Sequence, residues 1–217
     1  MNIQLSFMVS YTLLLTTGTI CFIEALRTNN PMIRHIFNLE TCISIVAGYF
    51  YYVFLEKLKE YEREKKKIDW KEMTQLRYLD WSITTPMMLI VLCATLAYNT
   101  KRVVHFQVMC MVLFLNYAML YFGFIGETHV NKYPAACASF IAFFLMYGII
   151  FYNYIKPKYN LPNIIFYTIY FVVWTIYGIV YFLEEGTKNI YLNILDMISK
   201  CFTGIGLWLY YTKIVVS

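Results

Sequence analysis

Charged side chains are scarce in this sequence of 217 residues. Only 14% of the residues are Asp, Glu, Lys or Arg, whereas 60% are apolar. An average soluble domain carries about 25% charged residues, so we exclude a water-soluble domain. Long basic blocks are also missing, although 18 Lys and Arg against 13 Asp and Glu give a net charge of +5, and this argues against nucleic acid as a partner. We therefore expect a multi-pass integral membrane protein whose partner is the lipid bilayer.

Metal-binding and disulfide motifs are missing as well. The six cysteines lie singly inside apolar runs, without a C-x-x-C spacing, and are interpreted as small buried hydrophobes. The three histidines are far apart, so no metal site is predicted. No basic segment precedes the first apolar run, which favours a retained membrane anchor over a cleavable signal peptide.

Seven apolar stretches fill most of the chain. A helix that spans a bilayer needs about 20 residues, and each stretch has that length. We expect an all-α fold, a single seven-helix membrane domain over residues 1–217. The predicted helices cover residues 5–26, 35–55, 78–99, 103–125, 133–155, 161–183 and 189–214.

The distribution of Lys and Arg predicts the orientation of the chain. None precedes the first helix, and Arg27 and Arg34 follow it, which places the N-terminus outside and, with seven helices, the C-terminus in the cytoplasm. The basic residues between positions 56 and 76 conflict with this orientation, but the first helix usually dominates. Pairs spaced i, i+3 in that loop, such as Glu56 with Lys59, would support a helical extension there, but a solvated spacer is the preferred interpretation.

Four ionisable residues stand out within or directly beside the predicted helices, where charges are costly and mark functional sites. Lys200 is the deepest, roughly 17–20 Å from either end of its helix, too far for its side chain to reach water. Asp196 lies one turn earlier on the same face, and Arg77 and Asp80 share a face of the third helix. A lysine desolvated in an apolar cavity is primed to condense with an aldehyde, and the two carboxylates could balance the resulting cation.

The segment around Asp80 reads RYLDWSITTP. Thr84 follows Asp80 by four residues, so its hydroxyl is expected to hydrogen-bond the Asp80 carboxyl group and tune its proton affinity. Trp81 and Thr85 form the adjacent stripe, and Pro86 is expected to kink the helix by freeing a backbone carbonyl.

Together, RYLDWSITTP in the third helix and the L-D-x-x-x-K element of the seventh resemble the microbial (type 1) rhodopsins, which are seven-helix retinal proteins. The short length and brief loops are similar to those of the compact rhodopsins of large marine viruses. The resemblance implies all-trans retinal as the cofactor, covalently bound to Lys200 through a Schiff base. It also implies that Asp80 is the counter-ion and proton acceptor, Asp196 a second counter-ion, and Arg77 an outward gate.

The same resemblance implies a retinal pocket. Its predicted members are Trp81, Thr85, Tyr167, Tyr170 and Trp174, the last three spaced i, i+3 and i+7 on the sixth helix. Phe171 stands where the family usually has a proline, which puts the expected hinge of that helix in doubt.

One departure from the family pattern concerns reprotonation. The carboxylate that reloads the Schiff base in proton pumps lies 11 residues after the acceptor, and here that position is Val91. Glu40 in the second helix and Glu24 in the first are the candidate proton donors or inner gates, and either could instead be an interfacial acid. The family's release carboxylates have no clear match, since Ile179 takes one expected place and Glu184 and Glu185 are merely nearby.

Three functions follow from the resemblance, and none is enzymatic. The first is a light-driven outward proton pump with Asp80 as acceptor. The second is a light-gated cation channel, conducting protons or small cations along a seam lined by Ser10, Glu40 and Asn193. The third is a photosensory rhodopsin. The resemblance also implies a homo-oligomer, a trimer or a pentamer.

Overall fold

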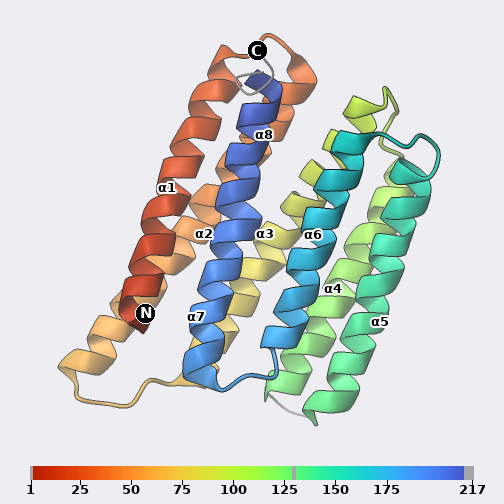
Figure 1. Ribbon diagram of the computed structural model, residues 1–217. Helices are drawn as coiled ribbons and strands as arrows, with labels where there is room; N and C mark the ends of the chain where they lie inside the picture. Colours follow the sequence, from red (N-terminus) through yellow and green to blue (C-terminus); the bar gives the residue numbers. More distant parts are fainter. Residues whose placement is uncertain (1, 129–130, 213–217) are drawn as a thin grey trace. The chain divides into compact units, whose positions relative to one another are not determined.

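The protein is described by a computed structural model covering residues 2–128 and 131–212, which is helical throughout with short connections (Figure 1). The elements in chain order are α1 (Ile3–Arg27), α2 (Pro31–Arg63), α3 (Trp70–Asn99), α4 (Phe106–Thr128), α5 (Lys132–Ile150), η1 (Phe151–Ile155), α6 (Leu161–Val180), α7 (Glu185–Asp196), η2 (Met197–Phe202) and α8 (Thr203–Thr212). The elements η1 and η2 are π-helical turns.

Within the described residues, seven helices are long and apolar enough to cross a membrane. The π-helical turn η1 continues α5, and η2 joins α7 to α8, so that residues 132–155 and 185–212 each form one span. The predicted all-α, seven-helix membrane fold is therefore confirmed. The predicted end of the last helix, at residue 214, lies outside the described residues.

The second and third helices are longer than predicted, because both have caps that the hydropathy pattern does not show. Asn30 caps α2, its side chain accepting hydrogen bonds from the backbone N–H groups of Met32 and Ile33, with Pro31 as the first helical residue. Asp69 caps α3, its Oδ1 accepting from the N–H groups of residues 71 and 72 at 2.9 and 3.2 Å.

The far end of α2 is a helical extension held by charged pairs. Lys59 Nζ lies 2.8 Å from Glu56 Oε1, as predicted from their i, i+3 spacing. Lys57 Nζ lies 2.9 Å from Glu72 Oε1, and the Tyr61 hydroxyl also donates to Glu72, so the end of α2 is tied to the start of α3. The connection between the two helices is thereby reduced to residues 64–69.

The chain divides into two compact units. Unit 1 comprises residues 1–73 and 179–217, hence α1, α2, the start of α3, the end of α6 and the α7–η2–α8 span. Phe7 of α1 packs its ring against those of Tyr51 and Phe54 of α2. Further along, a Cβ on Gly18 would lie 3.0 Å from Ser44 Cβ, so glycine permits the close approach of α1 and α2. Figure 1 shows that α1 begins and α8 ends at opposite ends of this unit.

Unit 2 comprises residues 74–178, the remainder of α3 with α4, α5 and most of α6. Asn163 of α6 is fully buried and ties this helix to α3, donating to the Leu96 carbonyl at 2.9 Å and accepting from Asn99 Nδ2 at 2.8 Å. Ser139 of α5 donates to the Met119 carbonyl of α4 at 2.9 Å. Polar contacts between helices thus fix the packing of unit 2 at several depths.

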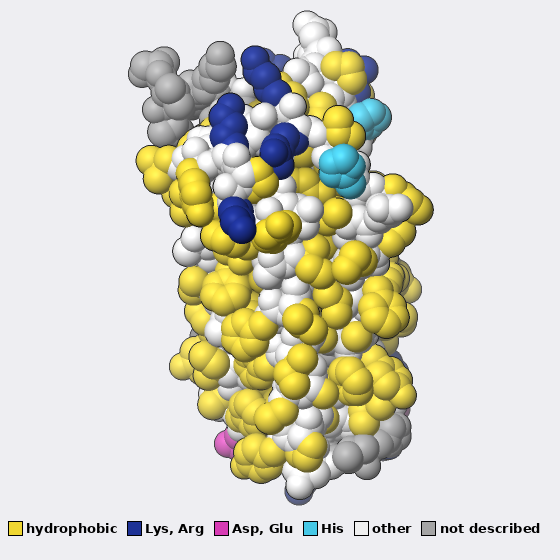
Figure 2. Space-filling view, turned by 90° about the vertical axis from the view of Figure 1, so that its right-hand side faces the viewer, with side chains coloured by type: hydrophobic (Ala, Val, Ile, Leu, Met, Phe, Trp, Pro, Cys, Tyr) yellow, Lys and Arg dark blue, Asp and Glu magenta, His cyan; other side chains and the backbone are white. Residues whose placement is uncertain are grey.

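Unit 2 exposes the surface expected of a protein in lipid. Large apolar side chains of α4 and α5 point outward, among them Phe114, Ile141 and Phe144. Figure 2 shows hydrophobic side chains over most of one face, with Lys and Arg gathered at one end. Exposed basic residues lie in the connections that follow α3 and α5, at positions 101, 102, 156 and 158. A hydrophobic surface of membrane-spanning length belongs in a bilayer, and the protein is an integral, multi-pass membrane protein.

Candidate functional site

Lys200 lies in the π-helical turn η2, in the middle of the last span. Its side chain is buried, and its Nζ lies 3.4 Å from Asp196 Oδ2. The Thr203 hydroxyl donates to the carbonyl of Ile198, five residues earlier, at 3.2 Å. Single π turns are frequent at functional sites, and this one carries the residue that the sequence singles out. The structure brings Lys200 and Asp196 together as their spacing predicts.

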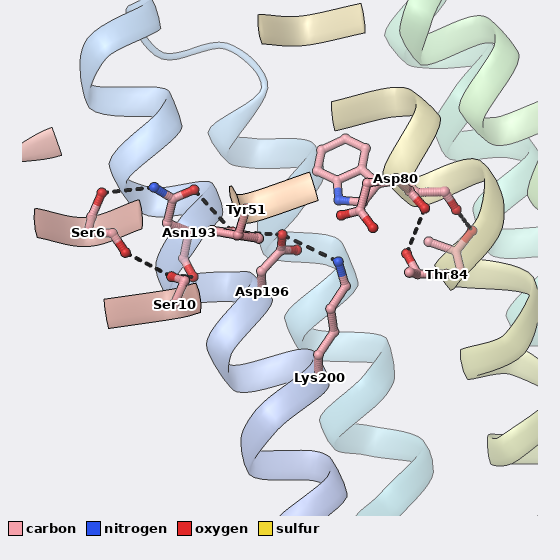
Figure 3. A network of polar contacts seen from close by, with 10 residues as sticks. Ser6, Ser10, Tyr51, Asp80, Thr84, Asn193, Asp196 and Lys200 are labelled. Atoms are coloured by element: carbon pink, nitrogen blue, oxygen red, sulfur yellow. Dashed lines mark hydrogen bonds and ion pairs between the residues drawn. The ribbon is translucent and has the colours of Figure 1, made fainter. Parts of the chain in front are cut away.

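Asp196 is held from the side by Tyr51 of α2. The Tyr51 hydroxyl donates to Asp196 Oδ2 at 2.9 Å and also lies 3.1 Å from Asn193 Oδ1 (Figure 3). All three side chains are buried. A hydrogen bond and a nearby ammonium group together stabilise the ionised form of a carboxylate that is buried away from water. Tyr51 therefore fixes the position of the carboxylate beside Lys200.

Asn193 extends this network to α1. Its Nδ2 donates to Ser6 Oγ at 2.8 Å, and Ser10 Oγ lies 3.3 Å from its backbone carbonyl (Figure 3). Ser10 and Asn193, two of the residues expected to line a cation seam, are therefore in contact. Direct hydrogen bonds between protein groups join Asn193 to Ser6 and Ser10.

Glu40 lies deeper than the sequence indicated. Because α2 begins at Pro31, Glu40 is nine residues into the helix, roughly 13 Å from its start, and its side chain is 2% exposed. A Cβ on Gly204 would lie 3.2 Å from Glu40 Oε2 and 2.9 Å from Thr17 Cγ2. The interfacial alternative for Glu40 is therefore wrong. Its carboxyl group packs on the backbone of α8, four residues after Lys200.

Glu24 has the surroundings of an interfacial acid. It lies in the last turn of α1, where its Oε2 accepts from Trp208 Nε1 at 3.3 Å and lies 3.9 Å from Arg27 Nη1. These contacts do not include Glu40 or Lys200. Of the two candidate donors, Glu40 alone is fully buried.

The third-helix motif lies in unit 2, on α3. Arg77, Asp80 and Thr84 are buried on one face of the helix, spaced i, i+3 and i+7. The expected bond from Thr84 to the Asp80 carboxyl group is not what the structure shows, because the Thr84 hydroxyl donates to the Asp80 backbone carbonyl at 2.9 Å (Figure 3). A threonine inside a helix readily bonds the carbonyl four residues earlier, and here that contact takes the hydroxyl hydrogen.

Trp81 and Thr85 occupy the neighbouring stripe of α3. The Trp81 ring packs edge-on against Tyr177 of α6, with centroids 5.6 Å apart. Thr85 donates to the Trp81 carbonyl and accepts from Asn116 Nδ2 of α4 at 2.9 Å, which gives the buried Asn116 a structural role. Pro86 leaves the Ser82 carbonyl without its helical donor, and Tyr117 of α4 supplies one at 3.2 Å.

The three aromatic residues of α6 that were predicted to line the retinal pocket differ in burial. Tyr170 and Trp174 are buried, whereas Tyr167 is half-buried, and its hydroxyl donates to the Tyr147 carbonyl of α5 at 3.1 Å. Phe171 stacks on Tyr167 with ring planes 7° apart. The helix continues without a break through position 171, where the family usually has a proline.

Two residues of the site have no signal in the sequence. Tyr51 is one of 21 tyrosines, and nothing in its local sequence distinguishes it. Lys188, buried in the first turn of α7, resembles an interfacial lysine when its sequence alone is considered. Both depend on which helices pack together.

In the part of the chain that the structure describes, seven helices are able to span a membrane, and a buried lysine lies beside a carboxylate in the last of them. The sequence matches the family described as bacteriorhodopsin-like protein over residues 2–214, and the chain belongs to this family. Members are integral membrane proteins that bind retinal, so the resemblance found in the sequence is confirmed.

Solved structures and curated proteins agree with this assignment. The structure is similar to that of the viral rhodopsin OLPVRII, with a TM-score of 0.90, 40% sequence identity, and coverage of 98% of both chains. It shares its fold with the proton-pumping rhodopsin AR2 from Acetabularia acetabulum, with a TM-score of 0.77, 16% identity, and coverage of 99% of this chain and 96% of the other. Among curated proteins, the opsin-like protein carO of Fusarium fujikuroi is 23% identical over 219 residues, which cover 89% of this chain and 69% of that protein.

The residues present fit retinal. A lysine whose side chain is 1% exposed, with a carboxylate 3.4 Å from its Nζ, is suited to a covalently held cationic group.

Proposed function

We propose that the protein is a light-driven outward proton pump with Lys200 as the attachment site. The observation that carries this proposal is the buried Lys200–Asp196 pair with Tyr51 hydrogen-bonded to Asp196. Bound covalently to Lys200, all-trans retinal would supply light absorption and photoisomerisation. The chain's own residues would then hold and move one proton.

Asp80 is proposed as the acceptor. It is a fully buried carboxylate on α3, and Arg77 three residues earlier provides a positive charge on the same helix face. In the dark, Lys200 Nζ holds a proton and Asp196 balances its charge. After light absorption, Asp80 takes this proton on a carboxylate oxygen, and the N-out orientation makes the outer side its destination.

Glu40 is proposed as the group that returns a proton to Lys200. Val91, in the usual donor position, is buried and cannot carry a proton. The proposal that Glu40 is the donor is supported by its burial and by its contact with the backbone at Gly204, about one turn beyond Lys200. It would give up its own proton to Lys200 Nζ and take another from the cytoplasm. Glu24, at the end of α1, is a less suitable donor because Trp208 and Arg27 contact its carboxylate.

A light-gated cation channel is the second candidate. The contacts that Ser10 and Ser6 make with Asn193 place polar groups along α1 and α7, and a channel would need these hydrogen bonds to open. Glu40 lies apart from them, against Gly204. This separation favours the pump over a continuous cation seam. Assembly into trimers or pentamers stays a prediction.

Two measurements test the proposal. Lys200→Ala should abolish visible absorption after retinal is added, because no amine is left to bind it. An unchanged spectrum would remove every rhodopsin function. Under voltage clamp, the illuminated wild-type protein should drive outward current at every attainable voltage. A current that reverses near a cation equilibrium potential would replace the pump by the channel.

A further inference from the structure

A second buried lysine lies at the start of the last span. Lys188 is in the first turn of α7, and its side chain is 2% exposed. Its Nζ lies 2.7 Å from Glu185 Oε1, one turn earlier. A lysine this close to a helix end could extend into water, yet here it is turned into the protein. Lys188 is therefore not placed there to be hydrated, and its burial needs another explanation.

The two charges of this pair differ in their access to water. The Glu185 side chain is 33% exposed, whereas that of Lys188 is almost fully enclosed. Water and salt screen an exposed charge far more than a buried one. The positive charge of Lys188 is therefore less screened by water than the negative charge of Glu185.

Lys188 lies on the same buried side of α7 as Asp196, the partner of Lys200. Asn189, Asn193 and Asp196 are also buried there, and Lys188 precedes Asp196 by eight residues, roughly 12 Å along the helix. Polar groups thus continue from the Lys200–Asp196 pair to the start of the helix. A fixed positive charge stands near the outer end of this polar path, on the side where the N-out orientation places the start of α7.

We propose that Lys188, held by Glu185, excludes metal cations from the outer end of the transport path and so makes the path selective for protons. This inference rests on the proposed pump and names the residue that determines its ion selectivity. A sodium or potassium ion passing along α7 would have to move beside a buried ammonium group, which repels it in a medium of low dielectric constant.

A proton can pass where a metal ion cannot, because it moves by transfer between hydrogen-bonding groups. Glu185 offers such a group, since its Oε2 atom is buried and accepts no hydrogen bond from the part of the chain that the structure describes. A proton that arrives from the Asp196 side can add to this oxygen and then pass to the solvent that reaches the Glu185 side chain, which is 33% exposed. The same oxygen does not provide the several ligands that a dehydrated metal ion needs.

The test compares photocurrents of three variants and the wild-type protein, all loaded with retinal. Lys188→Met removes the charge and keeps an unbranched chain, and Lys188→Arg keeps the charge. Lys59→Met is the matched control, because Lys59 also pairs with a glutamate at i−3, at 2.8 Å, but is 60% exposed. The absorption spectrum of each variant reports whether it is folded and loaded. If Lys188→Met does not load retinal, Lys188→Gln decides by the same criterion.

We expect Lys188→Met to acquire a current that reverses with voltage, with a reversal potential that shifts by up to about 59 mV for a tenfold change in external sodium. Lys188→Arg and Lys59→Met should keep a current of one direction. A one-directional, sodium-independent current in both Lys188→Met and Lys188→Gln would overturn this inference and leave the pump intact. A sodium-dependent reversal already present in the wild-type protein would overturn the proposed pump and, with it, the exclusion of cations by Lys188.

Discussion

The hydroxyl group of Tyr51 gives the sharpest test of how the site is built. It lies 2.9 Å from Asp196 Oδ2 and 3.1 Å from Asn193 Oδ1, and its ring is fully buried. A hydroxyl has one hydrogen, so it can donate to one of these oxygens at a time. The charged oxygen is both the closer and the stronger acceptor. Tyr51→Phe therefore removes one hydrogen bond to a carboxylate and leaves no cavity.

The expected loss of stability is that of a single hydrogen bond. A hydrogen bond to a charged group contributes about 1.5–3 kcal/mol, and the ring packing against Phe7 and Phe54 is retained. We expect Tyr51→Phe to lower the free energy of unfolding by about 2 kcal/mol. The assay is equilibrium unfolding in detergent mixtures, followed by loss of visible absorption. Tyr52→Phe is the control, because Tyr52 is next in sequence and 49% exposed.

The same variant has a spectroscopic signature. Without the Tyr51 donor, the negative charge of Asp196 is less dispersed and acts more strongly on the cation at Lys200, 3.4 Å away. A stronger counter-ion stabilises the ground state of that cation, so absorption should shift to the blue. If Tyr51→Phe and Tyr52→Phe differ by less than about 0.5 kcal/mol and neither shifts the spectrum, the reasoning about this network is refuted.

Three further outcomes are expected. Glu40→Gln should slow recovery of the dark state several-fold in time-resolved absorption, because its amide cannot donate the proton, and an unaltered photocycle eliminates it as the donor. Gly204→Ala should destabilise the protein by about 1–3 kcal/mol in the same unfolding assay, since its Cβ would lie 2.9 Å from Thr17 Cγ2. Gly206→Ala is the control and should not destabilise it, because no atom lies within 4 Å of the added Cβ. Equal effects of the two substitutions would contradict the packing described. If Asp80 is the counter-ion, Asp80→Asn should shift absorption to the red because the cation at Lys200 loses a balancing negative charge, and a constant maximum would exclude Asp80 from that role.

Local sequence predicts well where one helix carries both partners. Asp196 and Lys200 are four residues apart, and the structure brings them together through a helix that a hydrophobic run already indicates. It predicts less well where a side chain has a local alternative. Thr84 has the spacing to reach the Asp80 carboxyl group, but the carbonyl in the preceding turn is an equally near acceptor, and its hydroxyl donates there.

Helix ends were the weakest part of the sequence prediction. Hydropathy marks the apolar part of a helix, whereas α2 continues through charged residues to Arg63 because Lys57 and Tyr61 bind Glu72 at the start of α3. The other end of α2 changed the interpretation of Glu40: because the helix begins at Pro31, Glu40 is deeper in it than the apolar run indicates.

The sequence alone determined the class of this protein, its seven apolar spans and the position of a lysine deep in the last span. It did so because a bilayer requires each helix to satisfy its own backbone, and that requirement is written in residues close together along the chain. Tertiary structure decided that Tyr51 holds Asp196, that Glu40 packs on Gly204, and that Lys188 is buried. These facts depend on which face of each helix meets another, and the contacting residues are far apart in sequence, so no local pattern encodes them.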